Sequence, residues 1–515
     1  MMWTGSRRLA TRTLVLAAVA AVVVGALPAM AGATVATPAG AWPFPNADLA
    51  NTRDAVASTI TSSNVADLAR AWTFKLSGKG ATNVAGAGSL AANPVVVNGV
   101  VYIQDLESNV YALSLATGKL AWEYRVDVAL RSGPGPDGVA VADGAVFGAS
   151  PTTVFALNAA TGKKIWIDRH LLNGGQGTFG IQPQVTDGDV YLASGYGSGP
   201  GGGVLLDLDA STGSVLWRFN TILRTDQGVR AVGLGSGGAW QTPLVGDDGS
   251  VTFGIGNPYQ TPGSAIAHPA AQLYTDSDVN LDAATGKLRW YYQGVPNDFK
   301  DYDMQASPIS VSIGGVEAVI GGGKMGIVYA MDAQSGQLLW KTPVGEHNGH
   351  DDDSLRALEH QGTLKVPFTY LPGAIGGVLS NMAVAGTTVY VVTCDLPFTV
   401  SSLSEVLGRP PKGARPTGEV EALNLATGAV EWDTKVPSLP LGAATVSNDL
   451  LVTTLFNGTL VALDTATGAI VYRHSLPTST NAPIAIAGNT ILVPAGGPGV
   501  GRDSGHPQLV AYTVP

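Results

Sequence analysis

The sequence has only one cysteine, Cys394, among 515 residues. A single cysteine excludes any disulfide bond within the chain, and it also excludes a haem attached through a C-x-x-C-H motif. The fold therefore has to be stabilised by packing and by closure of its sheets rather than by covalent cross-links.

Charged residues are also scarce, at 13% of the chain, and acidic residues outnumber basic ones. The formal net charge is −10 at pH 7 and the pI is about 5.1. No run of Lys and Arg occurs after residue 13. Because a polyanion is bound by a clustered basic surface, this composition argues against nucleic acid as a partner.

Long apolar runs are absent except near the N-terminus, where residues 14–30 follow a start that contains Arg7, Arg8 and Arg12. Small residues end this run, at positions 29, 31 and 33. The pattern predicts a cleaved export signal over residues 1–33, and hence a secreted protein without a stable membrane span. The alternative is an uncleaved membrane anchor, which the small residues at the end of the run disfavour.

Glycine and proline are abundant, at 67 and 31 residues, which favours short strands and tight turns. Seven segments repeat one pattern, in which an apolar strand, a Thr-Gly or Ser-Gly turn and a second strand lead to an aromatic residue. They are VYALSLATGKLAW (110–122), VFALNAATGKKIW (154–166), VLLDLDASTGSVLW (204–217), DVNLDAATGKLRW (278–290), VYAMDAQSGQLLW (328–340), VEALNLATGAVEW (420–432) and LVALDTATGAIVY (460–472). Each predicts a β-hairpin whose glycine supplies a positive φ and whose final ring packs between adjacent sheets. An Asp or Asn before the turn is expected to accept hydrogen bonds from its amides.

The spacing of these turns predicts a β-propeller. The turn glycines lie 40 to 92 residues apart, and the shorter spacings match one four-stranded blade. An eighth unit is split, with Trp72 in an outer strand that lacks a partner and QLVAYTVP (508–515) as the missing inner strand; pairing them closes the ring. We therefore predict an all-β, eight-bladed propeller over residues 69–515, preceded by an N-terminal arm over residues 34–68. An open solenoid would need capping units and would leave the two half-hairpins unused.

One acidic insertion differs from the repeats. The segment Asn297-Asp298-Phe299-Lys300-Asp301-Tyr302-Asp303 follows the fourth hairpin and occurs nowhere else in the chain. A single insertion in a repeat array is where a functional site is usually added to the scaffold. The alternative interpretation is a solvated acidic turn.

The repeats resemble the tryptophan-docking repeats of the pyrroloquinoline quinone (PQQ)-dependent dehydrogenases, over nearly the whole mature chain. The segment NADLANTR…SSNVADLARAW (46–72) is similar to that family's entry segment. The resemblance implies an alcohol or sugar hydroxyl as substrate, and PQQ with Ca²⁺ or a lanthanide ion as cofactors. Without a haem motif, it also implies a separate electron acceptor. Similar repeats build non-enzymatic propellers, so a binding or assembly scaffold is the alternative function.

Local matches to this family imply the site residues. GGAWQTPLV (237–245) is similar to the segment whose tryptophan lies under the PQQ ring, which gives that role to Trp240. GIGNP (254–258) is similar to the family's G-T-G-N-P, which makes Asn257 a metal ligand. In the acidic insertion, Asp301 matches the catalytic base at the metal, and Asp303 matches the additional ligand of lanthanide-type members. Lys324, in GGGKMGIVYAMD (321–332), matches the residue that contacts the quinone oxygens.

Several positions depart from the family pattern. Ser198 replaces a metal-binding Glu, and Asp137 replaces an Arg that binds the PQQ carboxylates, with Arg131 near enough in sequence to compensate. Asn297 and Lys300 replace the His and the Trp of the catalytic motif. Lys300 would lower the pKa of the neighbouring base if the two paired. The vicinal cysteines that many members place over the ring are absent.

Two further loops have no assigned role. GEHNGHDDDS (345–354) offers His347, His350 and three Asp as ligands for a divalent cation, although a solvated loop explains the same residues. The Pro-rich segment 395–418 is expected to form part of a lid over one end of the channel or to bind a partner.

Overall fold

The computed structural model describes residues 40–78, 90–129, 135–195, 202–222, 237–361, 364–496 and 507–515. The predicted export signal, Arg131 and Ser198 lie outside these residues. Within the described ranges, no helix is long and apolar enough to cross a membrane.

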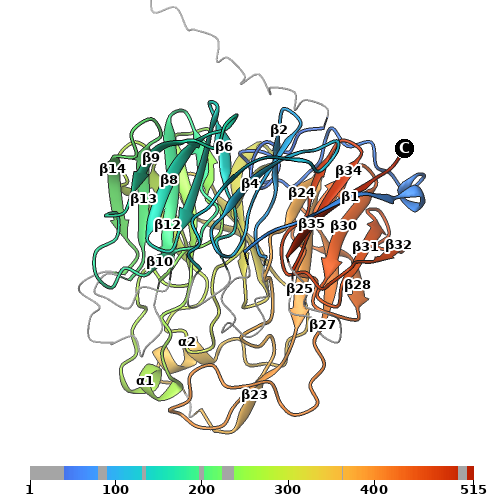
Figure 1. The fold of residues 1–515 in the computed structure, drawn as a ribbon. Helices are drawn as coiled ribbons and strands as arrows, with labels where there is room; N and C mark the ends of the chain where they lie inside the picture. Colours follow the sequence, from blue (N-terminus) through green and yellow to red (C-terminus); the bar gives the residue numbers. More distant parts are fainter. Residues whose placement is uncertain are drawn as a thin grey trace, which may run out of the picture. The chain divides into compact units, whose positions relative to one another are not determined.

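Eight antiparallel sheets follow one another along the chain, and each is one blade of a propeller (Figure 1). Blade one contains β2 (Val95–Val97), β3 (Val100–Gln104), β4 (Val110–Ser114) and β5 (Leu120–Tyr124). Blade two contains β6 (Ala140–Ala142), β7 (Ala145–Ser150), β8 (Thr153–Asn158) and β9 (Lys164–Asp168). Blade three contains β10 (Thr178–Phe179), β11 (Gln184–Thr186), β12 (Asp189–Gly195), β13 (Val204–Asp209) and β14 (Val215–Asn220). Blade four contains β15 (Leu244–Gly246), β16 (Ser250–Ile255), β17 (Ser277–Asp282) and β18 (Leu288–Gln293).

The later blades repeat this order. Blade five contains β19 (Ile309–Ile313), β20 (Val316–Gly323), β21 (Ile327–Asp332) and β22 (Leu338–Pro343). Blade six contains β24 (Ala383–Ala385), β25 (Thr388–Asp395), β27 (Thr417–Asn424) and β28 (Val430–Val436). Blade seven contains β29 (Thr445–Ser447), β30 (Leu450–Leu455), β31 (Thr459–Asp464) and β32 (Ile470–Ser475). Blade eight contains β33 (Ala485–Ala487), β34 (Thr490–Ala495), β35 (Gln508–Thr513) and β1 (Ala69–Lys75).

Blade eight is built from both ends of the chain. Its outer strand, β1, pairs antiparallel with β35, so that Ala69 lies opposite Thr513 and Lys75 opposite Gln508. This pairing confirms the predicted closure. With β1 in place, β35 is paired on both sides and has no free edge to which another chain could pair.

Adjacent blades are joined by a tryptophan that lies on the turn glycine of the next blade. The indole N–H also donates to the carbonyl three residues before that glycine, as in Trp217 to Ala283 at 2.7 Å, beside Gly286. The same arrangement joins Trp72 to Gly118, Trp122 to Gly162, Trp166 to Gly213, Trp290 to Gly336, Trp340 to Gly428 and Trp432 to Gly468. A side chain on any of these glycines would overlap the ring, so glycine is required both for its positive φ and for this contact.

The N-terminal arm crosses the inner ends of several blades. Arg53 is fully buried. Its guanidinium donates to Asn46 Oδ1 and, in blades seven and eight, to the Ala444 carbonyl at 2.8 Å, the Thr445 hydroxyl at 2.8 Å and the Ile484 carbonyl at 2.6 Å. Asn51 donates to the Pro243 and Pro308 carbonyls, which precede β15 and β19. The arm therefore ties blades four, five, seven and eight together, and it ends in the short 3-10 helix η1 (Val65–Asp67).

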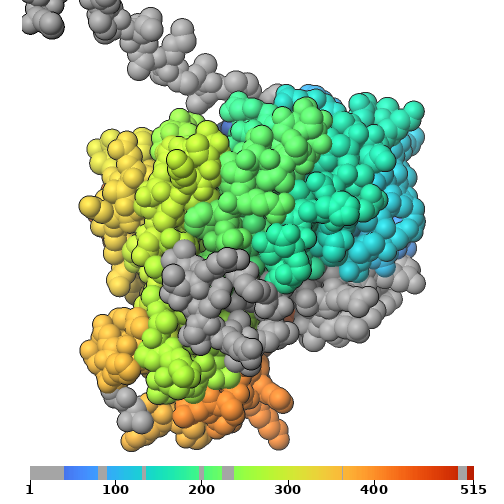
Figure 2. All heavy atoms as spheres, turned by 90° about the vertical axis from the view of Figure 1, so that its left-hand side faces the viewer, coloured from blue at the N-terminus to red at the C-terminus, as the bar shows by residue number. Residues whose placement is uncertain are grey.

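Long insertions gather beyond the blades, at the lower end of the view in Figure 1 and in Figure 2. They contain α1 (Pro262–Ala267), α2 (Asp353–Leu358), β23 (Phe368–Tyr370) and β26 (Phe398–Val400). β23 and β26 form a separate two-stranded sheet, with Phe368 opposite Val400. The Pro-rich segment 395–418 thus contributes one strand to this group, which we call the cap.

We expect Gly286→Ala to destabilise the propeller more than Gly314→Ala. Both glycines have a positive φ, but a Cβ on Gly286 would lie 2.6 Å from the Trp217 ring, whereas nothing lies within 4 Å of one on Gly314. The backbone strain should therefore be similar in the two variants. The overlap with the Trp217 ring should lower the free energy of unfolding of Gly286→Ala by about 1–3 kcal/mol more. The free energy of unfolding in urea measures the difference; equal losses would show that the ring contact does not limit this position.

Candidate active site

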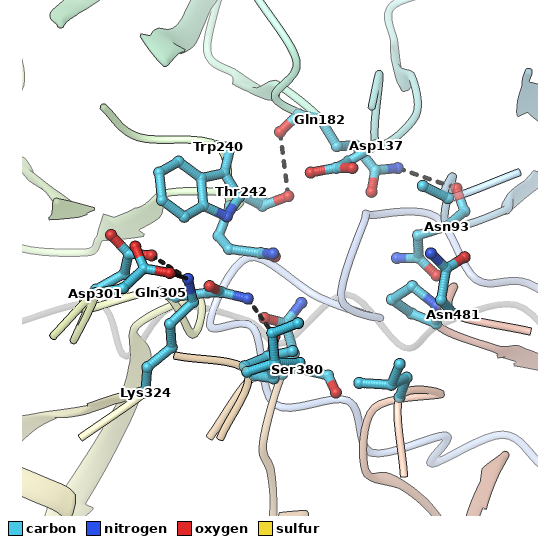
Figure 3. Close-up of a pocket in the computed structure, with 18 of the residues that line it drawn as sticks. Asn93, Asp137, Gln182, Trp240, Thr242, Asp301, Gln305, Lys324, Ser380 and Asn481 are labelled. Atoms are coloured by element: carbon cyan, nitrogen blue, oxygen red, sulfur yellow. Dashed lines mark hydrogen bonds and ion pairs between the residues drawn. The ribbon is translucent and has the colours of Figure 1, made fainter. Parts of the chain in front are cut away.

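A cavity of about 300 Å³ lies where the eight blades meet. Each blade contributes residues that lie just before its innermost strand, so the cavity is built by the ring as a whole. In chain order these are Asn93, Asp137, Gln182, Thr242, Gln305, Asn381, Leu441 and Pro483. Ala374 and Ile375, in the segment of the cap between β23 and β26, also line it. In Figure 3, Asp301 and Lys324 lie on one side of this cavity, and Asn93 and Asn481 lie on the other.

The acidic insertion is wound tightly and buried. Asp298 Oδ1 accepts from the Lys300 amide and Oδ2 accepts from the Tyr302 amide, both at 2.9 Å. Asn297 and Asp301 adopt positive φ angles of 59° and 71°. All of these side chains are at most 7% exposed, which contradicts the alternative of a solvated acidic turn.

The insertion brings the Asp301 and Asp303 carboxylates to the cavity, where both form ion pairs with the ammonium of Lys324. Lys324 Nζ lies 2.8 Å from Asp301 Oδ2 and 2.6 Å from Asp303 Oδ2. Lys324 reaches this point because it follows β20, the neighbouring inner strand of blade five. It is therefore a buried ion-pair partner and not a surface lysine.

Asn257 lies on the other side of the two carboxylates. Its side-chain nitrogen donates to Asp301 Oδ1 and, at 3.0 Å, to Asp303 Oδ1, and its backbone amide donates to Asp303 Oδ1 at 2.7 Å. Its side-chain oxygen accepts from the Tyr259 amide at 2.6 Å. In this arrangement the amide oxygen faces away from the carboxylates, so it would have to rotate to bind a metal ion with them.

Trp240 covers the same carboxylates from blade four. A Cβ on Gly256 would lie 2.6 Å from Asp303 Oδ1 and 2.8 Å from the Trp240 ring, so the indole and the carboxylate approach one glycine from two sides. Four of the five residues implied by the family resemblance, Trp240, Asp301, Asp303 and Lys324, thus line the same cavity. Asn257 is placed there by its hydrogen bonds, although it does not line the cavity.

Burial and the neighbouring charges together determine the pKa values of Asp301 and Lys324. Burial raises the pKa of Asp301 to about 7, against the lowering effect of Lys324, and Asp303 raises it further. Burial alone would lower the pKa of Lys324, but Asp301 and Asp303 raise it above its ordinary value. A proton-accepting carboxylate beside a permanently charged ammonium is the result.

Lys300 does not pair with Asp301. Its ammonium lies 3.2 Å from Asp353 Oδ2 and donates to the His350 carbonyl, and its side chain is fully buried. Burial lowers its pKa, although Asp353 and Asp298 counteract this. The expected effect of Lys300 on the base is therefore replaced by that of Lys324.

The loop with His347 and His350 is held by its own contacts. His347 Nδ1 lies 2.8 Å from Asp351, and His350 Nδ1 lies 2.8 Å from Asp353, at the start of α2. Among the described residues, these side chains do not form a group with the spacing of metal ligands. The loop positions α2 and, through Asp353, the buried Lys300.

The part of the cavity around Asp137 is polar and acidic. Asp137 lies beside Gln182, which donates to the Asn93 carbonyl at 3.2 Å (Figure 3). Burial raises the pKa of Asp137 well above its ordinary value. Lys324 is the only cation among the described residues of the lining, and it is already paired.

Comparison with known proteins agrees with this architecture. Residues 42–146 and 182–352, together more than half of the chain, match the sequence profile "Glucose/ethanol/alcohol dehydrogenase, beta-propeller domain". The chain belongs to this family of PQQ propellers. Residues 125–238 and 416–512 also match the profile of the outer membrane protein assembly factor BamB, which is built from similar repeats.

Individual relatives of the chain include an alcohol dehydrogenase and a hydroxylase. The chain is 28% identical over 346 residues to the quinohemoprotein alcohol dehydrogenase of Comamonas testosteroni, which covers 60% of this chain and 48% of that enzyme. It is 25% identical over 503 residues to lupanine 17-hydroxylase (cytochrome c) of Pseudomonas sp, covering 85% and 70%. The chain thus spans about half the length of the first of these relatives.

Solved structures of such dehydrogenases share the fold. The quinohemoprotein alcohol dehydrogenase from Comamonas testosteroni superposes with a TM-score of 0.76 at 21% identity, over 92% of this chain and 80% of that one. A europium-containing methanol dehydrogenase gives 0.71 at 19% identity, over 92% and 98%.

Two carboxylates behind the site of this PQQ propeller were not singled out from the sequence. Asp276 and Asp278 are fully buried, and none of their four carboxylate oxygens has a hydrogen-bond partner among the described residues. Burial raises the pKa of Asp276 well above its ordinary value and that of Asp278 to about 8. Asp278 lies in β17 and points toward blade five, where Gly321 leaves room for its carboxylate, whereas Asp276 precedes β17 with a positive φ of 49°. The sequence gives one signal, which is the charge of TDSD (275–278) in a strand that is otherwise buried.

We expect Asp278→Asn to remove a pH-dependent loss of stability. Because the folded-state pKa of about 8 exceeds the unfolded value, the folded chain binds more protons between pH 4 and 8. Stability should therefore fall as pH rises, by up to about 1.4 kcal/mol per pH unit from this group.

The free energy of unfolding at pH 5 and pH 8 measures this slope, which should be shallower in Asp278→Asn. Asp282→Asn is the control, because Asp282 is at the exposed end of the same strand and its pKa is lowered by hydrogen bonds from Thr285. A slope that Asp278→Asn leaves unaltered would contradict the burial argument.

Proposed function

We propose that the chain is the propeller of an exported quinoprotein dehydrogenase that oxidises an alcohol or a sugar hydroxyl. The convergence of Asp301, Asp303, Lys324 and Trp240 on one cavity is the observation that carries this proposal. The family membership supports it, and the N-terminal pattern supports export.

The residues present fit two parts of the cofactor set. The Trp240 indole offers a flat apolar face for the PQQ ring system. The Asp301 and Asp303 carboxylates, with the Asn257 amide after rotation, offer the oxygen ligands that Ca²⁺ or a lanthanide ion requires. Two carboxylate ligands favour an ion with a high positive charge.

The part of the cavity around Asp137 fits PQQ less well. The carboxylates of PQQ would meet Asp137, and the neighbouring amide groups of Gln182 and Asn93 already donate to the Asn93, Val139 and Pro45 carbonyls. Like charges in a buried cavity repel strongly, so binding should be weaker than a cationic residue at this position would allow.

Bound PQQ would supply the two-electron chemistry, by accepting a hydride from the substrate carbon. Asp301 would take the hydroxyl proton as that hydride leaves. Without a bound ion, burial raises the pKa of Asp301 to about 7, and the Lys324 ammonium lies 2.8 Å from its Oδ2. Ala374 and Ile375 of the cap would exclude water from the reacting atoms. The electrons would then pass to a separate acceptor.

A binding or assembly scaffold is the second candidate. The match of two segments to the BamB profile favours it, as does the ammonium of Lys324, which already neutralises the carboxylates. In this case the cavity would have no redox role.

The deciding experiment adds PQQ and Ca²⁺ or La³⁺ to the purified protein. We expect bound quinone absorbance together with dye-coupled oxidation of one or more members of an alcohol and sugar panel. Asp301→Asn should lower turnover by about 10²–10⁴-fold and retain quinone, because it removes the proton acceptor but not the cavity. Asp143→Asn is the control for the replacement of an Asp by Asn, because Asp143 lies in the exposed turn before β7. Absence of quinone binding with either ion would leave the scaffold function.

Asp137→Asn should strengthen PQQ binding, and the gain should increase with pH, because burial raises the pKa of Asp137 and only its ionised form repels the carboxylates of the ligand. Quinone titration at constant ionic strength measures the dissociation constant. A weaker or identical constant would show that these carboxylates lie away from Asp137.

A further inference from the structure

Blade six differs from the other blades on the face of its two outer strands. In β27, Glu421 lies opposite Asp433 of β28, one residue before the pair formed by Ala422 and Trp432. The equivalent positions of the other hairpins are apolar or aromatic: Tyr111, Phe155, Leu206, Val279, Tyr329 and Val461. A buried carboxylate here requires compensation that the other blades do not need.

The surrounding carboxylates are spaced like the ligands of one ion. Oxygen atoms of Glu419, Glu421 and Asp433 all lie within 4.8 Å of one another. Calcium binds oxygen at about 2.3–2.6 Å, so oxygens in its coordination sphere are at most about 5 Å apart. Glu419 and Glu421 are each only 5% exposed. This is the one such group among the described residues.

The first residues of the insertion after β22 lie against this group. The Gly345 amide donates to Glu421 at 3.2 Å, and the Glu346 amide donates to Asp395 at 3.1 Å. Lys435 lies 2.7 Å from Glu346 and 3.1 Å from Glu419, but it is 67% exposed and sits at the rim. An exposed ammonium contributes little to neutralising carboxylates inside the interface.

A separate observation comes from Thr393 of β25. Its hydroxyl is fully buried and has no hydrogen-bond partner in the part of the chain that the structure describes. Thr393 lies directly opposite Glu419, so the two side chains share one face of the sheet. A Cβ on Gly345 would lie 3.0 Å from both Thr393 Oγ1 and Asp395 Oδ1, so the two oxygens face the same space.

We propose that a hard divalent cation, Ca²⁺, binds here between blades five and six. Glu419, Glu421 and Asp433 supply its carboxylate ligands, and the Thr393 hydroxyl supplies a neutral oxygen. The ion holds Gly345 and Glu346, and thus the start of the insertion that leads to α2 and the cap. This site does not depend on the proposed dehydrogenase function.

The test uses the purified protein, stripped with a chelator and without PQQ, and Ca²⁺ alone as the probe. Equilibrium dialysis counts bound ions, and thermal melting reports stabilisation. Glu421→Gln should bind one Ca²⁺ fewer than the unsubstituted chain. Without Ca²⁺ the variant should melt at a higher temperature, because a buried charge is removed. With Ca²⁺ it should lack the several-degree gain in Tm that this site gives the unsubstituted chain.

Glu123→Gln is the matched control. Glu123 occupies the position of Asp433 in blade one, where its partner is Tyr111, so this variant should bind as many ions as the unsubstituted chain. Asp303→Asn should remove a different ion, the one proposed for the cavity. Loss in Glu421→Gln but not in Asp303→Asn would support this site and contradict the cavity metal. Equal Ca²⁺ binding by Glu421→Gln and the unsubstituted chain would overturn the proposal.

Discussion

The contact between a tryptophan ring and the turn glycine of the next blade determines the geometry of the whole molecule. Its indole N–H also binds a carbonyl of the same turn, so both the distance and the angle between blades are set. Seven repeats of this contact, together with the pairing of β1 with β35, bring the inner ends of eight blades around one axis. This arrangement forms the cavity. The residues that precede each innermost strand come together around it, although some of them are hundreds of residues apart in the sequence.

The same constraint explains the role of the arm. A ring without disulfides can open only by separating blades, and Arg53 opposes this by binding blades seven and eight through one buried guanidinium. That charge has no carboxylate partner in its hydrogen bonds, and burial lowers its pKa to about 9. Its stabilisation comes from several carbonyl and hydroxyl acceptors at once, so it depends on the blades being in place.

Periodic features of the fold could be predicted from the sequence because each is encoded locally. The hairpins need only an alternating apolar strand and a Thr-Gly turn, and the split eighth blade is visible as two complementary halves. Asp301, Asp303, Trp240 and Lys324 could be brought together only through the family resemblance, since no local pattern relates positions that are 84 residues apart. In the structure these four side chains line one cavity, and their chemical roles stay predictions.

Features that depend on packing between blades could not be predicted. The Lys300 ammonium forms an ion pair with Asp353, which lies on α2 and comes 53 residues later in the chain. The isolation of the Asp278 carboxylate depends on Gly321 of β20, which leaves space for it but has no side chain that could donate a hydrogen bond. Similarly, the aligned repeats show that VEALN (420–424) carries a Glu where the others have apolar or aromatic residues, but only the structure shows that oxygens of Glu419, Glu421 and Asp433 lie within 4.8 Å of one another.

The two acidic sites are neutralised in different ways, and this difference bears on function. In the cavity, a buried lysine already lies between Asp301 and Asp303, so a metal ion would have to displace its ammonium from that gap. The displaced ammonium would still lie in the cavity, where it could donate to a ligand oxygen. In blade six the lysine is exposed, so an ion could bind without displacing a buried charge. The cavity is therefore expected to prefer the more highly charged ion, because only a strong attraction offsets the loss of the ion pair.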